Sequence, residues 1–157
     1  MKQKGFLCAL AGLLFTCCAS LQAGHAQEMG YWRASSSSAQ SVTGDVGISE
    51  GKVTIYFANF TIVKARDLEP AEVSSVFDVD SNNANNKGRL YKLDIPGAKK
   101  FMHKNTLCGG EDAQWMAVYS DGRTLHLAFF SGQKAPVFTL DAISNSSDMC
   151  GTYSYTR

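Results

Sequence analysis

The strongest constraint on the fold is the alternation of side chains along residues 115–131, WMAVYSDGRTLHLAFFS. Apolar residues recur at every second position on both sides of Asp121-Gly122, and this dipeptide between two alternating runs favours a β-hairpin. A type I′ turn at Asp121-Gly122 would pair Val118 with Leu125 and Met116 with Leu127. Since successive strand residues point to opposite faces, this register puts five apolar residues on one face, which we expect to be core. They are Met116, Val118, Leu125, Leu127 and Phe129.

The opposite face of the same hairpin is the strongest candidate for a binding surface. It carries Trp115, Tyr119, His126 and Phe130, an unusual set for a strand face turned towards water. Another sheet or the C-terminal tyrosines could cover these residues as a second core layer. Alternatively, they form a partly open platform or barrel mouth for an apolar or sugar-like ligand, or for a protein partner. On the second interpretation these four residues are the ligand- or partner-binding site.

Two shorter hairpins are predicted upstream. Residues 43–49 and 52–57 flank the turn Glu50-Gly51, and residues 60–66 return through Ala58-Asn59. This register gathers apolar residues on one face, and a slip by one residue would scatter them over both. The expected pairs are Ile48 with Val53, Val46 with Ile55, Ile62 with Ile55, and Phe60 with Phe57.

The rest of the chain adds short strands and a helical turn. Pro70 can begin a helical turn over residues 71–76, because proline is tolerated at the first helical position. Residues 89–95 alternate cleanly, residues 137–143 form an irregular strand, and residues 150–156 form the closing strand. Many short strands and almost no helical periodicity predict a mainly β fold, an antiparallel sandwich or small barrel with at most one or two short helical turns.

Residues 1–26 have the organisation of a secretory signal peptide. Lys2 and Lys4 precede an apolar run over residues 6–19, and Gly24-His25-Ala26 is a small-x-small cleavage site. The run is shorter than the roughly 20 residues that span a bilayer as a helix. We expect cleavage and export to the periplasm or medium, leaving residues 27–157 as a single β domain without a transmembrane segment. An uncleaved anchor and a lipoprotein attached at Cys18 are the less favoured alternatives.

The same cleavage would leave two of the five cysteines, Cys108 and Cys150. An even pair in an oxidising compartment is most simply one disulfide, rather than a catalytic thiol with a spare partner. It would join the segment that enters the central hairpin to the closing strand. In the entropic model, such a bond restricts the unfolded chain by about 4 kcal/mol.

The charge of the expected mature chain argues against two classes of partner. Loss of Lys2 and Lys4 changes the net charge from +1 to −1. A nearly neutral chain has no electrostatic reason to bind nucleic acid or anionic membranes.

The sequence carries no motif of a catalytic or cofactor site. No serine lies in a nucleophile elbow, and neither an H-E-x-x-H motif nor a glycine-rich phosphate loop occurs. Asp78, Asp80 and Asn82 have the spacing of a calcium loop, but Asn83 and Arg89 stand where glycine and a bidentate acid belong. We therefore expect a polar loop over residues 81–88, no metal site and no cofactor.

The contexts of the two cysteines resemble those of a group of small exported bacterial proteins without an assigned activity. The resemblance rests on the C-terminal third, on NTLCG around Cys108, CGTYSY from Cys150, and Trp115 and FFSG from Phe129 between them. It implies export, a bacterial source and a cysteine pair. The chain is also similar in size and strand content to periplasmic lysozyme inhibitors, and no site is carried over from them.

These observations favour an exported, non-catalytic β-protein that binds a protein or a cell-envelope component. The partner would be an envelope protein or a host protein. A calycin-like carrier of a small apolar ligand is the alternative, and a hydrolase is the third interpretation.

Overall fold

The structure is a computed structural model that describes residues 27–80 and 88–157. The expected leader, residues 1–26, lies outside the described residues, as does most of the expected polar loop, residues 81–87. None of the helices in the described ranges is long and apolar enough to cross a membrane.

The described residues form one antiparallel sheet of nine strands in the order β4-β3-β2-β1-β9-β8-β7-β6-β5. The strands are β1 (Gly30–Ala34), β2 (Val46–Ser49), β3 (Lys52–Ile55), β4 (Ala58–Thr61), β5 (Val63–Leu68), β6 (Gly88–Ile95), β7 (Ala113–Ser120), β8 (Thr124–Phe130) and β9 (Met149–Thr156). Short helical segments lie between them: the π-helix η1 (Ala39–Thr43), α1 (Pro70–Phe77), the 3₁₀ helix η2 (Met102–Lys104) and α2 (Leu140–Ser144). The prediction of a mainly β, antiparallel fold with few short helices is confirmed.

The sheet curls on itself without closing. Its edge strands, β4 and β5, follow each other in the chain with only Ile62 between them, and they are not paired with each other. The sequence suggested one strand over residues 60–66. The chain instead leaves one edge of the sheet at Ile62, which is buried, and starts the other edge. The two edges are therefore close in sequence while the sheet stays open.

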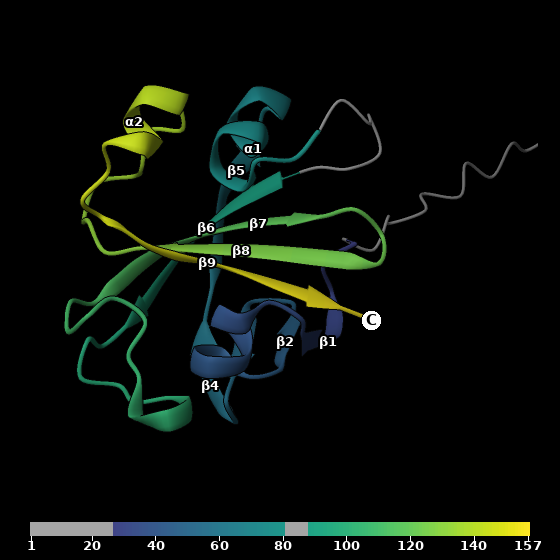
Figure 1. The fold of residues 1–157 in the computed structure, drawn as a ribbon, viewed down its shortest axis with the longest axis vertical. Helices are drawn as coiled ribbons and strands as arrows, with labels where there is room; N and C mark the ends of the chain where they lie inside the picture. The colour runs from purple at the N-terminus through teal and green to yellow at the C-terminus, as the bar shows by residue number, and fades with distance from the viewer. Residues whose placement is uncertain (1–26, 81–87) are drawn as a thin grey trace, which may run out of the picture.

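Two core layers result from this curl. In Figure 1, α1 and α2 lie on one side of β6–β9, and β1–β4 lie on the other. Residues predicted for the core face of the central hairpin, such as Met116 and Leu127, pack in the larger layer with the side chains of β1–β3. Residues of the opposite face pack in a smaller layer with α1 and α2. The division of the hairpin into two faces is thus confirmed.

The hairpin registers agree in part with the sequence. Ile48 pairs with Val53 and Val46 with Ile55 around Glu50-Gly51, as expected. In the central hairpin Val118 pairs with Leu127 instead of Leu125, a shift of two residues. The faces are preserved because the shift is even. Its cause is the turn, which is centred on Gly122-Arg123, with Gly122 at φ 90°.

The β3–β4 hairpin differs more. Ile55 pairs with Ala58, so the turn residues are Tyr56 and Phe57 and not Ala58-Asn59. Both have positive φ, 45° and 65°, which is the conformation of a type I′ turn. Asn-Gly is the usual sequence for this turn, and Tyr-Phe gave no such signal.

Local chemistry explains the helices. α1 begins at Pro70, as predicted, and a capping box joins Glu69 and Glu72 at its start. The prediction of an irregular strand over residues 137–143 was wrong. The side chain of Thr139 accepts a hydrogen bond from the Ala142 N–H and caps α2 in that segment.

Candidate functional site

The four predicted site residues lie on one face of β7 and β8 but differ in exposure. Tyr119 and Phe130 are 2% and 1% exposed, in the layer beneath α1 and α2. Tyr119 stacks on Phe77 of α1, and the ring of Phe138 meets Phe130 edge-on at 5.7 Å. These two residues have the burial of a second core layer. Their role as a ligand- or partner-binding site stays a prediction.

Trp115 lies at the margin of this layer and is half-buried. The ammonium of Lys92 sits 4.4 Å from the centre of its indole ring, and the same ammonium donates to the Gln114 side chain. The indole N–H is buried and has no hydrogen-bond partner within the described residues. A cation on the protein itself thus covers one face of the ring.

His126 makes a contact that the sequence did not reveal. Its Nδ1 lies 3.1 Å from the Ser154 hydroxyl, and its ring packs beside those of Phe77 and Tyr119, which also contact each other. Burial lowers the pKa of His126. A serine bonded to a histidine is the minimum of a nucleophile–base pair. Ser154 also has a structural role, because its backbone N–H donates to Ser36 Oγ and so ties β9 to the segment before η1.

A large apolar hollow lies elsewhere, on the outer side of β1–β3 beside η1 and η2. Its volume is about 640 Å³, within the range of small-molecule sites. We call it the aromatic hollow. It is lined by Tyr31, Ala34, Gln40, Gly44, Asp45, Val46, Gly47, Thr54, Tyr56, Phe57 and Met102.

Glycines form part of this hollow. Gly47 pairs with Tyr31 of β1 on one side and with Thr54 of β3 on the other. Because Gly47 has no side chain, only its backbone lies between the side chains of Tyr31 and Thr54. Gly44 has φ 61°, and a Cβ there would lie 2.7 Å from the sulfur of Met102. A side chain at Gly44 would be strained and would collide with the wall of the hollow.

Aromatic side chains form its rim. Tyr31, Tyr56 and Phe57 are 62%, 44% and 93% exposed, and they are the three exposed aromatic side chains of the described residues. All three line this one hollow. Tyr56 and Phe57 also hold the left-handed backbone of the β3–β4 turn, which is uncommon for bulky residues. Backbone strain of this kind concentrates at functional sites.

Asp45 is the one charged residue among the described residues that line the hollow. One carboxylate oxygen accepts the Tyr31 hydroxyl, and the other accepts the Ala34 N–H at 2.8 Å. The bond from Tyr31 lowers the pKa of Asp45 and raises the pKa of Tyr31, and the bond from Ala34 lowers the pKa of Asp45 further. The carboxylate is therefore ionised at neutral pH and held in place.

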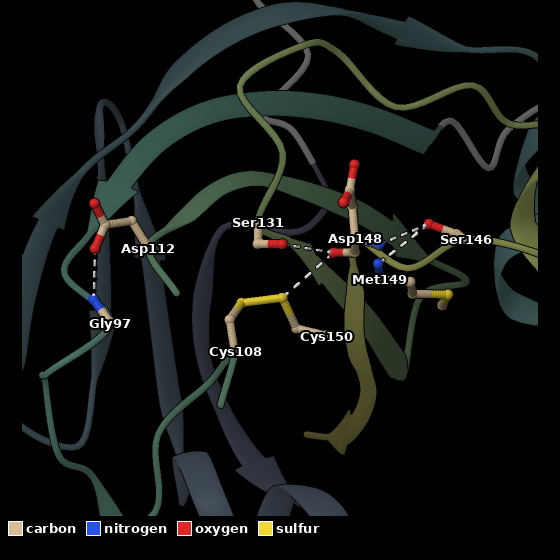
Figure 2. Close-up of a disulfide and its surroundings, with 8 residues drawn as sticks. All are labelled: Gly97, Cys108, Asp112, Ser131, Ser146, Asp148, Met149 and Cys150. Atoms are coloured by element: carbon tan, nitrogen blue, oxygen red, sulfur yellow. Dashed lines mark hydrogen bonds between the residues drawn. A yellow bond between two sulfur atoms is a disulfide. The ribbon is translucent and has the colours of Figure 1, made fainter. Parts of the chain in front are cut away.

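Two interactions support the sheet away from the hollow. The predicted disulfide between Cys108 and Cys150 is present, and Figure 2 shows it where the loop before β7 meets the start of β9. At the other site Glu28 is 2% exposed, forms an ion pair with Arg89 and accepts the Tyr91 hydroxyl at 2.9 Å. The segment before β1 is therefore held inside the fold.

Sequence reasoning missed the aromatic hollow. Its aromatic residues come from β1 and from a turn that was placed two residues too late. The available signal was Tyr56-Phe57, two adjacent aromatic residues at the end of an alternating strand.

Comparison of the chain with protein-family models, curated proteins and solved structures finds no match. The resemblance of the cysteine motifs to small exported bacterial proteins therefore stays a prediction.

Proposed function

We propose that this protein is an exported, non-catalytic binding protein, periplasmic or secreted, that docks a protein partner through the aromatic hollow. The observation that carries the proposal is the convergence of Tyr31, Tyr56 and Phe57 on one hollow. Exposed aromatic side chains that gather in one patch mark interaction sites on soluble proteins. Tyrosine is also among the residues that contribute most to binding energy at interfaces.

The turn conformation supports the same conclusion. Tyr56 and Phe57 occupy backbone conformations that glycine or asparagine would adopt at lower cost. Their rings lie 5.7 Å apart, yet Phe57 buries almost none of its surface in the fold. The ring of Phe57 therefore adds little to stability, and a partner would supply the contact that it lacks.

Export is supported by the disulfide, since such bonds persist in oxidising compartments. The partner would then be a protein of the cell envelope or of a host.

The predicted alternative, a carrier of a small apolar ligand, is favoured by one observation, the volume of about 640 Å³. Native mass spectrometry of the purified protein separates the two, because a carrier would retain a small molecule.

The test compares variants against one partner. A protein captured from an envelope extract is identified, purified and titrated against the wild-type protein, Phe57→Ala and Leu140→Ala. Leu140 is the matched control, because it is 69% exposed on α2 and lines no part of the hollow. We expect Phe57→Ala to weaken binding by about tenfold or more and Leu140→Ala to leave it unchanged. Equal affinities for all three proteins would refute the proposal.

A further inference from the structure

We infer that the aromatic hollow recognises a lysine or arginine side chain presented by the partner protein. The inference rests on the proposed function and deepens it by naming the chemical group that enters the site.

The charge of the lining is the first argument. Within residues 27–80 and 88–157, Asp45 carries the one charge in the lining of the hollow, and that charge is negative. The remaining lining is aromatic, apolar or neutral. A cationic group entering the hollow would meet a carboxylate without a competing cation in the wall. Arg33, which also helps to lower the pKa of Asp45, does not line the hollow.

The position of Asp45 is the second argument. Hydrogen bonds from Tyr31 and Ala34 reach both carboxylate oxygens and fix their orientation. An ionised carboxylate has about four acceptor positions, so two bonds leave capacity for an incoming N–H donor. A carboxylate that is already fixed loses little freedom when it binds such a donor.

The aromatic rim is the third argument. Tyr31, Tyr56 and Phe57 line the same hollow as Asp45. The faces of aromatic rings attract ammonium and guanidinium groups within about 6 Å, and aromatic residues beside a carboxylate suit the aliphatic stem and charged head of lysine or arginine. A neutral apolar ligand would leave the remaining acceptor positions of the Asp45 carboxylate without a donor from the ligand.

Exposure favours a side chain of a protein over a small free cation. Phe57 and Tyr31 remain 93% and 62% exposed, so much of their ring surface is open to solvent. A small ammonium ion could cover little of that area. The protein surface around a lysine or arginine would cover the rest.

The test is an NMR titration of the purified protein with three probes. Acetyl-lysine methylamide supplies the cationic side chain, acetyl-norleucine methylamide supplies a neutral chain of similar length, and tetramethylammonium supplies the charge alone. The amide resonances of Gly44 and Gly47 report on the hollow. We expect saturable shifts with the lysine probe and an affinity about three- to fivefold lower for the norleucine probe, as one cation–π or ion-pair contact would give. Tetramethylammonium should bind more weakly than lysine.

Variants assign the effect to Asp45. Asp45→Asn should weaken lysine binding by about three- to fivefold and leave norleucine binding unchanged. Glu50→Gln is the matched control, because it removes one carboxylate from the neighbouring β2–β3 turn without touching the lining. Equal affinities for lysine and norleucine, tighter binding of tetramethylammonium, or wild-type affinity in Asp45→Asn would overturn the inference. In those cases the loss of partner binding in Phe57→Ala would still support the proposed function.

Discussion

Replacing Phe57 by glycine should stabilise the protein while removing part of its binding surface. Phe57 holds φ at 65° in the β3–β4 turn. A left-handed conformation costs a residue with a side chain roughly 1–2 kcal/mol, and glycine avoids that cost. The greater freedom of glycine in the unfolded chain lowers the free energy of unfolding by roughly 0.5–1 kcal/mol and offsets part of this gain. The ring is 93% exposed, so its removal costs little burial.

The expected net gain is about 0.5–1 kcal/mol, which raises the melting temperature by about 2–4 °C for a domain of this size. Gly51 provides the reverse control. It has φ 69° in the β2–β3 turn, and a Cβ there would meet no atom within 4 Å. Gly51→Ala should therefore lower stability by about 1 kcal/mol through backbone strain alone.

Thermal and urea unfolding of the wild-type protein and both variants measure these changes. If Phe57→Gly is no more stable than the wild type while Gly51→Ala is destabilised, the ring of Phe57 contributes to the fold. In that case the β3–β4 turn does not maintain backbone strain for the sake of binding.

Three further predictions concern the supports of the sheet. Replacing Cys108 and Cys150 by serine should cost about 4 kcal/mol for a separation of 42 residues, and an unchanged melting temperature would contradict this. Glu28→Ala removes the acceptor of the buried Tyr91 hydroxyl and the ion-pair partner of the half-buried Arg89, which is left with the longer contact to Asp67 at 3.7 Å. This change should cost about 3 kcal/mol, whereas Glu28→Gln should cost less. Urea unfolding that ranks the two variants equally would count against it. Because burial lowers the pKa of His126 in the folded state, the unfolded state takes up a proton first, and stability should fall as pH drops below about 6.5. Unfolding at several pH values should show a smaller fall in His126→Gln, while His103→Gln, an exposed control on η2, should behave as the wild type.

The fold could be predicted where side-chain alternation was regular. The two faces of β7 and β8 and the pairing of Ile48 with Val53 followed directly from spacing. Turn positions were harder to predict, because the turns that contain Gly122 and Tyr56 could be placed only from the local turn preferences of the residues. The resulting register errors were of an even number of residues, so the core faces survived them.

The candidate site could not be predicted in the same way. Tyr31 and Asp45 come together only when β1 pairs with β2, and nothing local in the sequence specifies that pairing. Conversely, Tyr119 and Phe130 resembled a surface platform because residues 137–143 were not recognised as containing a helix. Helix α2 helps to form the layer in which these two side chains are buried.

The central claim is that the aromatic hollow is the recognition surface. Its most direct test is hydrogen exchange of the protein alone and in complex with the captured partner. The account predicts that protection on binding is concentrated at the β3–β4 turn with Tyr56 and Phe57, at Gly44 and at Gly47. Protection confined to the segment around Trp115 and His126, with the β3–β4 turn unchanged, would contradict it.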